Sequence, residues 1–196
     1  VLKANITLKL GTKATPATIA AEGYDAVIVA IGAEPQNLNI PGADSKKVVM
    51  PIHVYGHEEE LGKNIVVVGG GEIGAETGLY LAECGHQVTL LTRQDRVAPD
   101  ATCTHYREMF EERWLREKNF HFLTNVQIES VTDTGVIYRD REGTLCELPA
   151  DTVVISGGRA ADTKFALSFY GSANDFFLVG DCKTPGNVQK CMRMAY

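Results

Sequence analysis

Three glycines with the spacing Gly-x-Gly-x-x-Gly carry the clearest chemistry in this sequence, namely Gly69, Gly71 and Gly74. The first allows a tight turn after a strand, the second lets the backbone approach a pyrophosphate, and the third lets a helix pack closely. Free N–H groups at the start of that helix then favour an anion. The motif follows an apolar run at 65–68 and opens a helical one, which predicts a dinucleotide site. The alternative is a glycine-rich turn that is only structural.

The helix after the first glycines adds further candidates for cofactor binding. Glu72 and Ile73, which lie between the second and third glycine, are candidates as part of the motif. Glu76 lies in the first turns of the same helix, and its carboxylate could reach the nicotinamide end of a bound cofactor. The alternative for Glu76 is an exposed charge on the helix surface.

The end of the next strand indicates which dinucleotide is preferred. A site for NAD usually has Asp or Glu there to bind the ribose hydroxyls. This sequence has Thr92 and then Arg93, with Arg96 nearby. No carboxylate would repel a 2′-phosphate, and an arginine can pair with one, so we expect NADPH rather than NADH. The alternative is that Arg93 is a solvated surface residue and that NADH is used.

A strand ending in Gly180-Asp181 is the second place where a ligand could bind. It would put a carboxylate at the carboxyl edge of a strand, where α/β sheets bind their ligands. Asp181 is therefore a candidate for binding polyol or ribityl hydroxyls, and the alternative is a turn or helix-capping aspartate. The five histidines are scattered and no nucleophile–base pair is visible. We therefore expect no catalytic side chain, since hydride transfer between cofactors requires positioning rather than a protein nucleophile.

The cysteines do not predict a metal or dithiol site. None of the five forms a Cys-x-x-Cys pair, so zinc, iron–sulfur and redox-disulfide chemistry lack their usual spacing. We expect reduced thiols in a cytoplasmic protein. The five are Cys84, Cys103, Cys146, Cys182 and Cys191.

The elements that must position these residues follow the pattern of an α/β fold. A strand at 65–68, a helix at 72–84 and a strand at 86–92 make a βαβ unit of about 28 residues, close to the expected length. An amphipathic helix at 106–118 is expected to turn Met109, Phe110, Trp114 and Leu115 inward. A strand at 120–123, a β-meander at 126–148 and a buried strand at 151–156 follow.

The flanking segments are expected to hold fewer elements. They comprise a half-buried strand at 5–10, a short linker or turn at 15–21, a strand buried on both faces at 24–31, a loop at 32–42, a strand at 176–179 and a helix at 187–196.

The bulk composition limits the classes of function. The 196 residues are 44% hydrophobic and 22% charged, as in an ordinary globular protein. The formal net charge is −6 and no stretch is dense in Lys or Arg, so we expect no nucleic-acid partner. No apolar run approaches the roughly 18 residues that span a bilayer, and no signal peptide is visible, so no membrane partner is expected.

Two segments with the same layout indicate that the chain crosses twice between two domains. YDAVIVAIGAEP (24–35) and ADTVVISGGRAA (150–161) each have an acidic residue, an apolar strand, a glycine and a bend. We therefore divide the chain into residues 1–59, residues 60–158 and residues 159–196. The middle part is a Rossmann-like parallel sheet with a β-meander, inserted into a partial second domain. Because the sequence starts at Val1 and stops within a helix, we expect a piece of a longer protein.

These segments resemble the two-dinucleotide-binding-domain flavoproteins, in which a nucleotide domain is inserted into an FAD domain. AIGAEP, with Gly32, is similar to the segment that leaves the FAD domain, and 155–161, with Gly157, to the one that returns. Gly180-Asp181 resembles the Gly-Asp pair that holds the ribityl chain of FAD. GGGEIGAE (69–76) matches the nicotinamide-domain motif. TRQDRV (92–97) resembles the NADPH-selective members, which carry two arginines; Arg93 matches the first, and Pro99 stands at the second.

The end of the chain narrows the resemblance to one branch. GDCKTPGNVQKCMRMAY (180–196) is similar to NADH:flavin oxidoreductases related to old yellow enzyme, such as 2,4-dienoyl-CoA reductase, 2-enoate reductase and trimethylamine dehydrogenase. The resemblance implies a further N-terminal barrel with FMN and a 4Fe–4S cluster, and hydride transfer from NAD(P)H to FAD for reduction of an activated alkene. The alternatives are another reductase of the superfamily, of the disulfide or ferredoxin type, or a non-catalytic dinucleotide-sensing module.

Overall fold

The computed structural model describes residues 5–36, 38–101 and 104–196, with the side chains of 104–106 excluded, so that Cys103 lies outside the described residues. The chain divides into two compact units: unit 1 comprises Val1–Glu34 and Arg159–Tyr196, and unit 2 comprises Pro35–Gly158. Unit 2 thus begins at Pro35 rather than at residue 60, because the intervening segment adds β3 to its sheet and Val54 to its core.

Unit 2 is built on a parallel sheet of five strands in the order β3-β10-β4-β5-β6. This sheet confirms the predicted α/β fold with its parallel sheet, and the predicted βαβ unit is its centre. The strands are β3 (Val48–Val49), β4 (Asn64–Val68), β5 (Gln87–Leu91), β6 (Phe120–Leu123) and β10 (Thr152–Ile155); the helices of the unit are η1 (Pro51–His53), η2 (Glu58–Glu60), α2 (Glu72–Glu83) and α3 (Thr104–Arg116).

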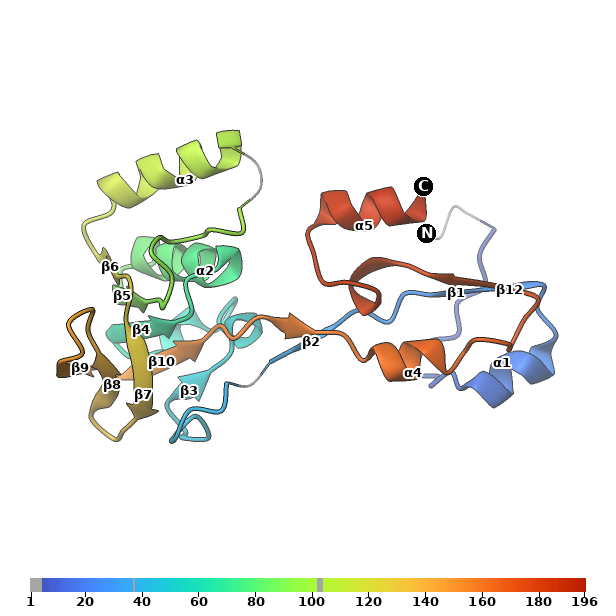
Figure 1. Ribbon diagram of the computed structural model, residues 1–196, viewed down its shortest axis with the longest axis horizontal. Helices are drawn as coiled ribbons and strands as arrows, with labels where there is room; N and C mark the ends of the chain where they lie inside the picture. Colours follow the sequence, from blue (N-terminus) through green and yellow to red (C-terminus); the bar gives the residue numbers. More distant parts are fainter. Residues whose placement is uncertain (1–4, 37, 102–103) are drawn as a thin grey trace. The chain divides into compact units, whose positions relative to one another are not determined.

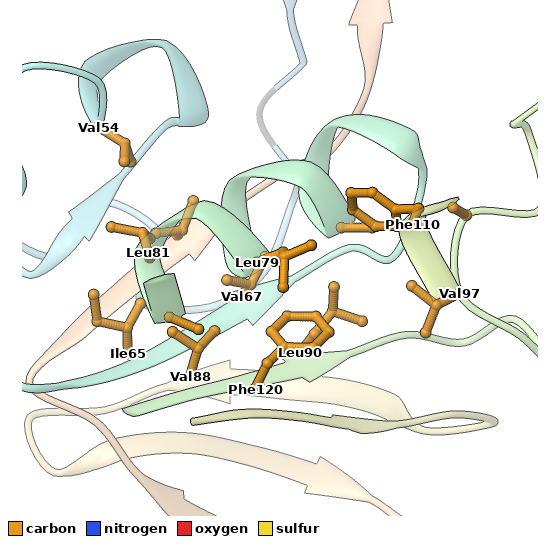
Figure 2. Packing of buried hydrophobic residues seen from close by; sticks show 14 residues of the cluster. Val54, Ile65, Val67, Leu79, Leu81, Val88, Leu90, Val97, Phe110 and Phe120 are labelled. Atoms are coloured by element: carbon orange, nitrogen blue, oxygen red, sulfur yellow. The ribbon is translucent and has the colours of Figure 1, made fainter. Parts of the chain in front are cut away.

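Alternating residues of β4 face two different hydrophobic clusters, because successive side chains of a strand point to opposite faces. Ile65 and Val67 belong to the cluster that also holds residues of α2 and Phe110 of α3, and Figure 2 shows this packing around Leu79, Leu90 and Phe120. Val66 and Val68 belong to the second cluster. The middle strand is therefore buried on both faces, as expected for a parallel sheet.

The second cluster joins the parallel sheet to the predicted β-meander. Val126, Val131 and Val136 pack there with Val153 of β10. The meander is an antiparallel sheet of three strands in the order β7-β8-β9, which confirms the prediction for 126–148. Its strands are β7 (Gln127–Val131), β8 (Gly135–Arg139) and β9 (Leu145–Pro149). Unit 2 thus has three layers: helices, parallel sheet and meander (Figure 1).

The inward face of α3 differs from the expected one. Phe110 is buried and Trp114 packs on it edge to face, with ring centroids 4.8 Å apart. Met109 and Leu115, however, are 54% and 89% exposed. The apolar pattern spans more of the helix circumference than the contact with the sheet requires, so only part of it is buried.

Unit 1 is smaller and contains β1 (Ala26–Val29) and β12 (Asp175–Leu178), which pair in parallel. Its core consists of Val29, Ala166, Phe169 and Cys182, with partly buried neighbours such as Ile19. Its remaining elements are α1 (Pro16–Glu22), α4 (Thr163–Leu167), η3 (Gly180–Cys182) and α5 (Val188–Ala195); two short strands, β2 (Glu34–Pro35) and β11 (Arg159–Ala160), form a further two-stranded sheet where the chain passes between the units.

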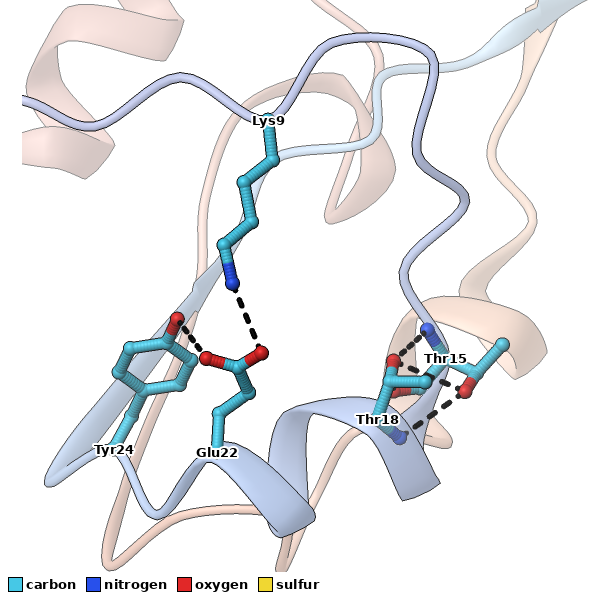
Figure 3. A network of polar contacts seen from close by, with 5 residues as sticks. All are labelled: Lys9, Thr15, Thr18, Glu22 and Tyr24. Carbon is cyan, nitrogen blue, oxygen red and sulfur yellow. Dashed lines mark hydrogen bonds and ion pairs between the residues drawn. The ribbon is translucent and has the colours of Figure 1, made fainter.

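Two expectations for the first residues are wrong. Residues 5–10 form no strand, since their alternating side chains are exposed and meet no neighbouring strand. Residues 15–21 are not a linker or turn, because Thr15 is the N-cap of α1 and residues 16–21 lie in that helix. Thr15 and Thr18 form a capping box, Pro16 stands at the first helical position, and Gly23 ends the helix in the left-handed conformation. Figure 3 shows this cap, together with the contacts of Glu22 at the other end.

The strand expected at 24–31 is present only as β1 and is not buried on both faces. Ile28 is 67% exposed, because β1 has a single partner strand and one face of the pair is uncovered. Pro35 lies in β2 rather than in a continuous loop. Among the described residues, none of the helices combines the length and apolar character needed to cross a membrane.

Candidate dinucleotide site

The candidate site lies where the chain reverses direction across the parallel sheet. From β4 the chain continues to β5 and β6 on one side, and β10 then returns to the opposite side of β4. Ligands of such sheets bind beyond the carboxyl ends of the strands at this switch point. A cavity of about 540 Å³ is found there, within the range of small-molecule sites. It is lined by Leu38, Asn39, Ile40, Val68, Gly69, Gly70, Gly71, Leu91, Thr92, Arg93, Gln94, Pro99, Asp100, Val126, Gln127, Ile128, Ser156, Gly157 and Gly158.

The glycine turn between β4 and α2 is packed too closely for other residues at two of its positions. Gly69 has φ +107°, and a Cβ there would lie 2.2 Å from the carbonyl oxygen of Ser156. A Cβ on Gly74 would lie 1.9 Å from the carbonyl oxygen of Gly69. These contacts agree with the roles assigned from the sequence: a tight turn at Gly69 and close packing of the helix at Gly74.

Gly71 lines the cavity, as Gly69 does, but it differs from both of these glycines in what surrounds it. The nearest atoms to a Cβ on Gly71 belong to the Asp100 carboxylate, at 3.2 Å and 3.5 Å for its two oxygens. Backbone atoms are absent from the three nearest neighbours of that position. The surface above Gly71 is thus bordered by the end of a side chain rather than by the protein backbone, which fits the close approach of a ligand phosphate.

The start of α2 is capped from outside the helix. Gly71 is the N-cap residue and has no side chain to accept a hydrogen bond. Instead, the Glu72 N–H donates to Asp100 Oδ1 over 2.8 Å. Burial raises the pKa of the Glu72 carboxyl, and the negative charges of Glu76 and Asp100 raise it further. The carboxylates of Glu72, Glu76 and Asp100 therefore lie near the helix end at which the glycine motif predicts a bound anion.

The three candidates at the end of β5 separate in the structure. Thr92 is buried and lines the cavity, and its Oγ1 accepts a hydrogen bond from the Gln94 N–H over 3.2 Å. Arg93 is exposed at the cavity wall, and no ion pair to it occurs within the described part of the chain. Arg96 lines a different cavity of about 380 Å³ beside Trp114 and Arg107.

The other candidates on the helix do not line the first cavity. Ile73 is exposed and Glu76 half-buried on α2, and both lie outside the cavity wall, as do Glu72 and Gly74. Gly157 lines the cavity after β10, and a Cβ there would lie 2.5 Å from the carbonyl oxygen of Gln36.

Unit 1 holds the remaining candidates, Gly32, Gly180 and Asp181. Gly32 and Gly180 have φ of +76° and +72°. The Asp181 side chain is 14% exposed, and its carboxylate accepts hydrogen bonds from Arg159 Nη1 and, over 2.9 Å, from the Gly186 N–H. Cys191 Sγ lies 3.5 Å from Asp181 Oδ1. The pKa of the Cys191 thiol is raised, mainly by burial and then by the neighbouring Asp181 carboxylate.

Sequence reasoning missed Asp100 and Arg159 as partners of the two sites. Asp100 follows β5 by nine residues, and only its return to the start of α2 in the folded chain shows its contact. Arg159 directly follows Gly158 in the second segment that crosses between the domains, and this position could have indicated a residue close to the site. No group of three or more His, Cys, Asp or Glu side chains suited to a metal ion occurs among the described residues.

Comparison with known sequences identifies relatives for nearly the whole chain. A family model described as pyridine nucleotide-disulphide oxidoreductase matches residues 4–175. Bilirubin reductase of Mediterraneibacter gnavus (strain CC55_001C) is 32% identical over 178 residues, which cover 91% of this chain and 27% of that protein. Cinnamate reductase of Clostridium sporogenes is 25% identical, with 97% of this chain and 28% of that protein covered.

Solved structures give the same result for the fold. A 2-naphthoyl-CoA reductase in complex with 2-naphthoyl-CoA superposes with a TM-score of 0.86 and 30% identity, covering 97% of this chain and 29% of that one. Histamine dehydrogenase from Rhizobium sp. 4-9 shares the fold, with a TM-score of 0.77 at 16% identity over 92% of this chain and 31% of that one. The resemblance inferred from the sequence is thereby confirmed, and the chain spans less than a third of the length of these relatives.

Proposed function

The chain belongs to the pyridine nucleotide-disulphide oxidoreductase family, and from this premise we propose that it is the NAD(P)H-binding portion of a flavin-dependent oxidoreductase. In this proposal the cavity beside the glycine turn holds the nicotinamide dinucleotide. When bound, the dinucleotide would supply a hydride and FAD would accept it. The observation that carries the proposal is the cavity at the switch point, which the glycine motif borders and in which Gly71 leaves room for a phosphate.

The residues of the cavity have distinct roles in this proposal. The turn at Gly69–Gly71 and the start of α2 receive the pyrophosphate, because free N–H groups and the helix dipole favour an anion there. Thr92 and Val126 line the wall that follows β5, where the adenosine half would lie. Glu76 remains a candidate for the nicotinamide end, as inferred from its place on the helix.

Arg93 is proposed to pair with the 2′-phosphate of NADPH. Its guanidinium is exposed at the cavity wall beside Thr92. Both residues follow β5, the strand whose end contacts the adenosine ribose in this type of site. A guanidinium can form two parallel hydrogen bonds with a phosphate. Arg96, three residues further, lines the second cavity and serves as a matched control for a nearby charge of the same kind.

Calorimetric titration with NADPH, NADH and ADP-ribose tests this proposal on the chain of 196 residues. We expect Arg93→Glu to weaken NADPH binding about tenfold or more, because charge-assisted hydrogen bonds are lost and a like charge is introduced. NADH binding should change less than about threefold, since it lacks the 2′-phosphate. Arg96→Glu should leave both affinities nearly unchanged. Absence of binding for all three ligands, or equal effects of the two substitutions, would contradict the proposal.

For the whole protein we propose FAD as the hydride acceptor, with Gly32, Gly180 and Asp181 at its site, and FMN and a 4Fe–4S cluster in the part outside this chain. The names of the relatives, cinnamate reductase and 2-naphthoyl-CoA reductase, support an activated alkene or a related conjugated acyl compound as substrate. Measuring NADPH oxidation by the longer protein with cinnamate as acceptor tests this part, and oxidation that cinnamate does not accelerate would argue against it.

A further inference from the structure

We propose that Asp100 is an internal anion that takes the place of the dinucleotide pyrophosphate at the start of α2 and thereby lowers the affinity of the cavity. The inference rests on the proposed function, from which the ligand is taken. Asp100 was not among the residues expected to contact a cofactor. Its position makes it a determinant of affinity within the same cavity.

The geometry places the Asp100 carboxylate where a ligand phosphate would bind. Oδ1 accepts the hydrogen bond from the Glu72 N–H over 2.8 Å, so one of the free donors of the helix is already used. Both carboxylate oxygens lie within 3.5 Å of the point that a Cβ on Gly71 would occupy. The glycine therefore opens a space that Asp100 borders, and a pyrophosphate would compete with Asp100 for it.

The backbone that carries Asp100 is anchored, so the carboxylate is held at the helix end. Ala98 is buried, has φ +48°, and donates its N–H to the Gly70 carbonyl over 2.7 Å. The Ala98 carbonyl accepts hydrogen bonds from Arg107 Nη1 over 2.8 Å and from the Ala101 N–H over 3.2 Å. The side chain of Asp100 is itself exposed, so a ligand that enters the cavity can reach its carboxylate.

The charges around this end of the cavity determine the direction of the effect. Arg93 and Asp100 are the only charged residues in the cavity wall within the described part of the chain. Glu72 and Glu76 add negative charge near the same helix end, and burial, followed by the charges of Glu76 and Asp100, raises the pKa of the Glu72 carboxyl. A pyrophosphate that enters must take the Glu72 N–H from Asp100 and then remain beside its negative charge. Removing that charge should therefore strengthen binding.

The substitution Asp100→Asn tests the inference, because an asparagine oxygen still caps the helix without carrying a charge. We expect ADP-ribose and NADPH to bind about two- to fivefold more tightly, the range given by one charge at a helix end. Adenosine, which lacks phosphates, should bind with unchanged affinity. Asp95→Asn in the same loop is the matched control, because Asp95 lines the second cavity, and it should leave all affinities unchanged.

The possible results separate this inference from the proposed function. If the unsubstituted chain binds no dinucleotide, the proposed function fails. If it binds ADP-ribose but Asp100→Asn binds it equally or more weakly, only the role of Asp100 fails. A weaker adenosine complex in the variant would likewise contradict it, by assigning Asp100 to the nucleoside. Thermal unfolding without ligand checks folding, and Asp100→Ser provides a second uncharged cap if the asparagine variant is unstable.

Discussion

The two units bury their strands to very different degrees. In unit 2 the central strand β4 is covered by α2 on one face and by the meander on the other, and four of its residues are fully buried. In unit 1 the pair β1–β12 has one buried residue, Val29, while Ile28 and Phe177 are 67% and 52% exposed. Unit 2 thus encloses its sheet on both sides and has a cavity at the carboxyl ends of its strands, whereas the β1–β12 pair of unit 1 leaves large apolar side chains exposed.

We therefore expect different kinds of contact to stabilise the two units. Parallel sheets are normally covered on both faces, and a two-stranded sheet is marginally stable by itself. Unit 1 relies more on local contacts, such as the capping box of α1 and the ion pair between Arg159 and Asp181. Unit 2 relies on its two hydrophobic clusters, one on each face of the parallel sheet.

The largest effect is expected from Gly74→Ala in unit 2. The added methyl group would lie 1.9 Å from the Gly69 carbonyl oxygen, so either the turn or α2 must move. We expect unit 2 to lose about 3 kcal/mol of stability, at the upper end of the cost of overpacking, together with dinucleotide binding. Urea unfolding and calorimetric titration with ADP-ribose provide the two measurements.

The matched change in unit 1 is Gly171→Ala, where a Cβ meets no atom within 4 Å but φ is +83°. Only backbone strain opposes this substitution, at about 1 kcal/mol. Dinucleotide binding should be unaffected by it. Equal losses of stability and binding in the two variants would show that the difference in burial between the units does not affect their stability or ligand binding.

Hydrogen exchange should show an intermediate effect without any substitution. We expect the amides of β1 to exchange at least about 100-fold faster than those of β4, because openings of a poorly covered sheet cost less free energy. Mass spectrometry of peptides that contain the two strands measures the difference. If peptides from β1 and β4 exchange at one rate, the chain opens as a single unit.

The smallest effect is expected at two contacts between a tyrosine and a glutamate. Tyr80 donates to Glu58 in unit 2, and this hydrogen bond is the main cause of the lowered pKa of Glu58. In unit 1, Tyr24 donates to Glu22 over 3.1 Å, and the pKa of Glu22 is lowered chiefly by Lys9 and then by Tyr24. Because each folded-state pKa lies below its ordinary value, ionisation stabilises the folded chain above that value, and the contribution disappears as the pH falls.

The substitutions Tyr80→Phe and Tyr24→Phe should therefore both destabilise slightly at neutral pH, and the loss should fade as the pH falls below about 4.5. Tyr80→Phe should cost more, since the Tyr80 ring also packs on Tyr55 with centroids 5.0 Å apart and holds its hydroxyl in place. Urea midpoints at several pH values measure both effects. A loss that grows toward acid pH would reverse the assigned sign.

Unit 2 was largely predictable from the sequence because its periodic signals are strong. The run of β-branched residues at β4, the glycine spacing and the alternation of the meander each point to one structure. The tight turn expected at Gly69 and the close helix packing expected at Gly74 also agree with the structure. In this unit the local sequence pattern agrees with the burial in the folded chain, so each helix or strand can be predicted from its own residues.

The remaining features depend on tertiary contacts that a local pattern does not contain. Residues 5–10 alternate as a strand would, yet no partner strand completes their hydrogen bonds. The helix α1 depends on a threonine capping box, a weaker signal than the Ser/Thr–Glu form. Asp100 contacts Glu72 across 28 positions of sequence, and the separation of Arg93 from Arg96 depends on how the loop after β5 turns.

The ends of unit 2 lie next to each other, since the Gln36 N–H donates to the Gly158 carbonyl over 2.9 Å. A segment of more than a hundred residues thus departs and returns at nearly one point. Such a segment can be exchanged, lengthened or inserted into another chain without stretching that chain, because its two ends lie close together. In evolutionary terms, the nucleotide preference of an enzyme could then be altered by recombination at these two positions while its other cofactor sites stay intact.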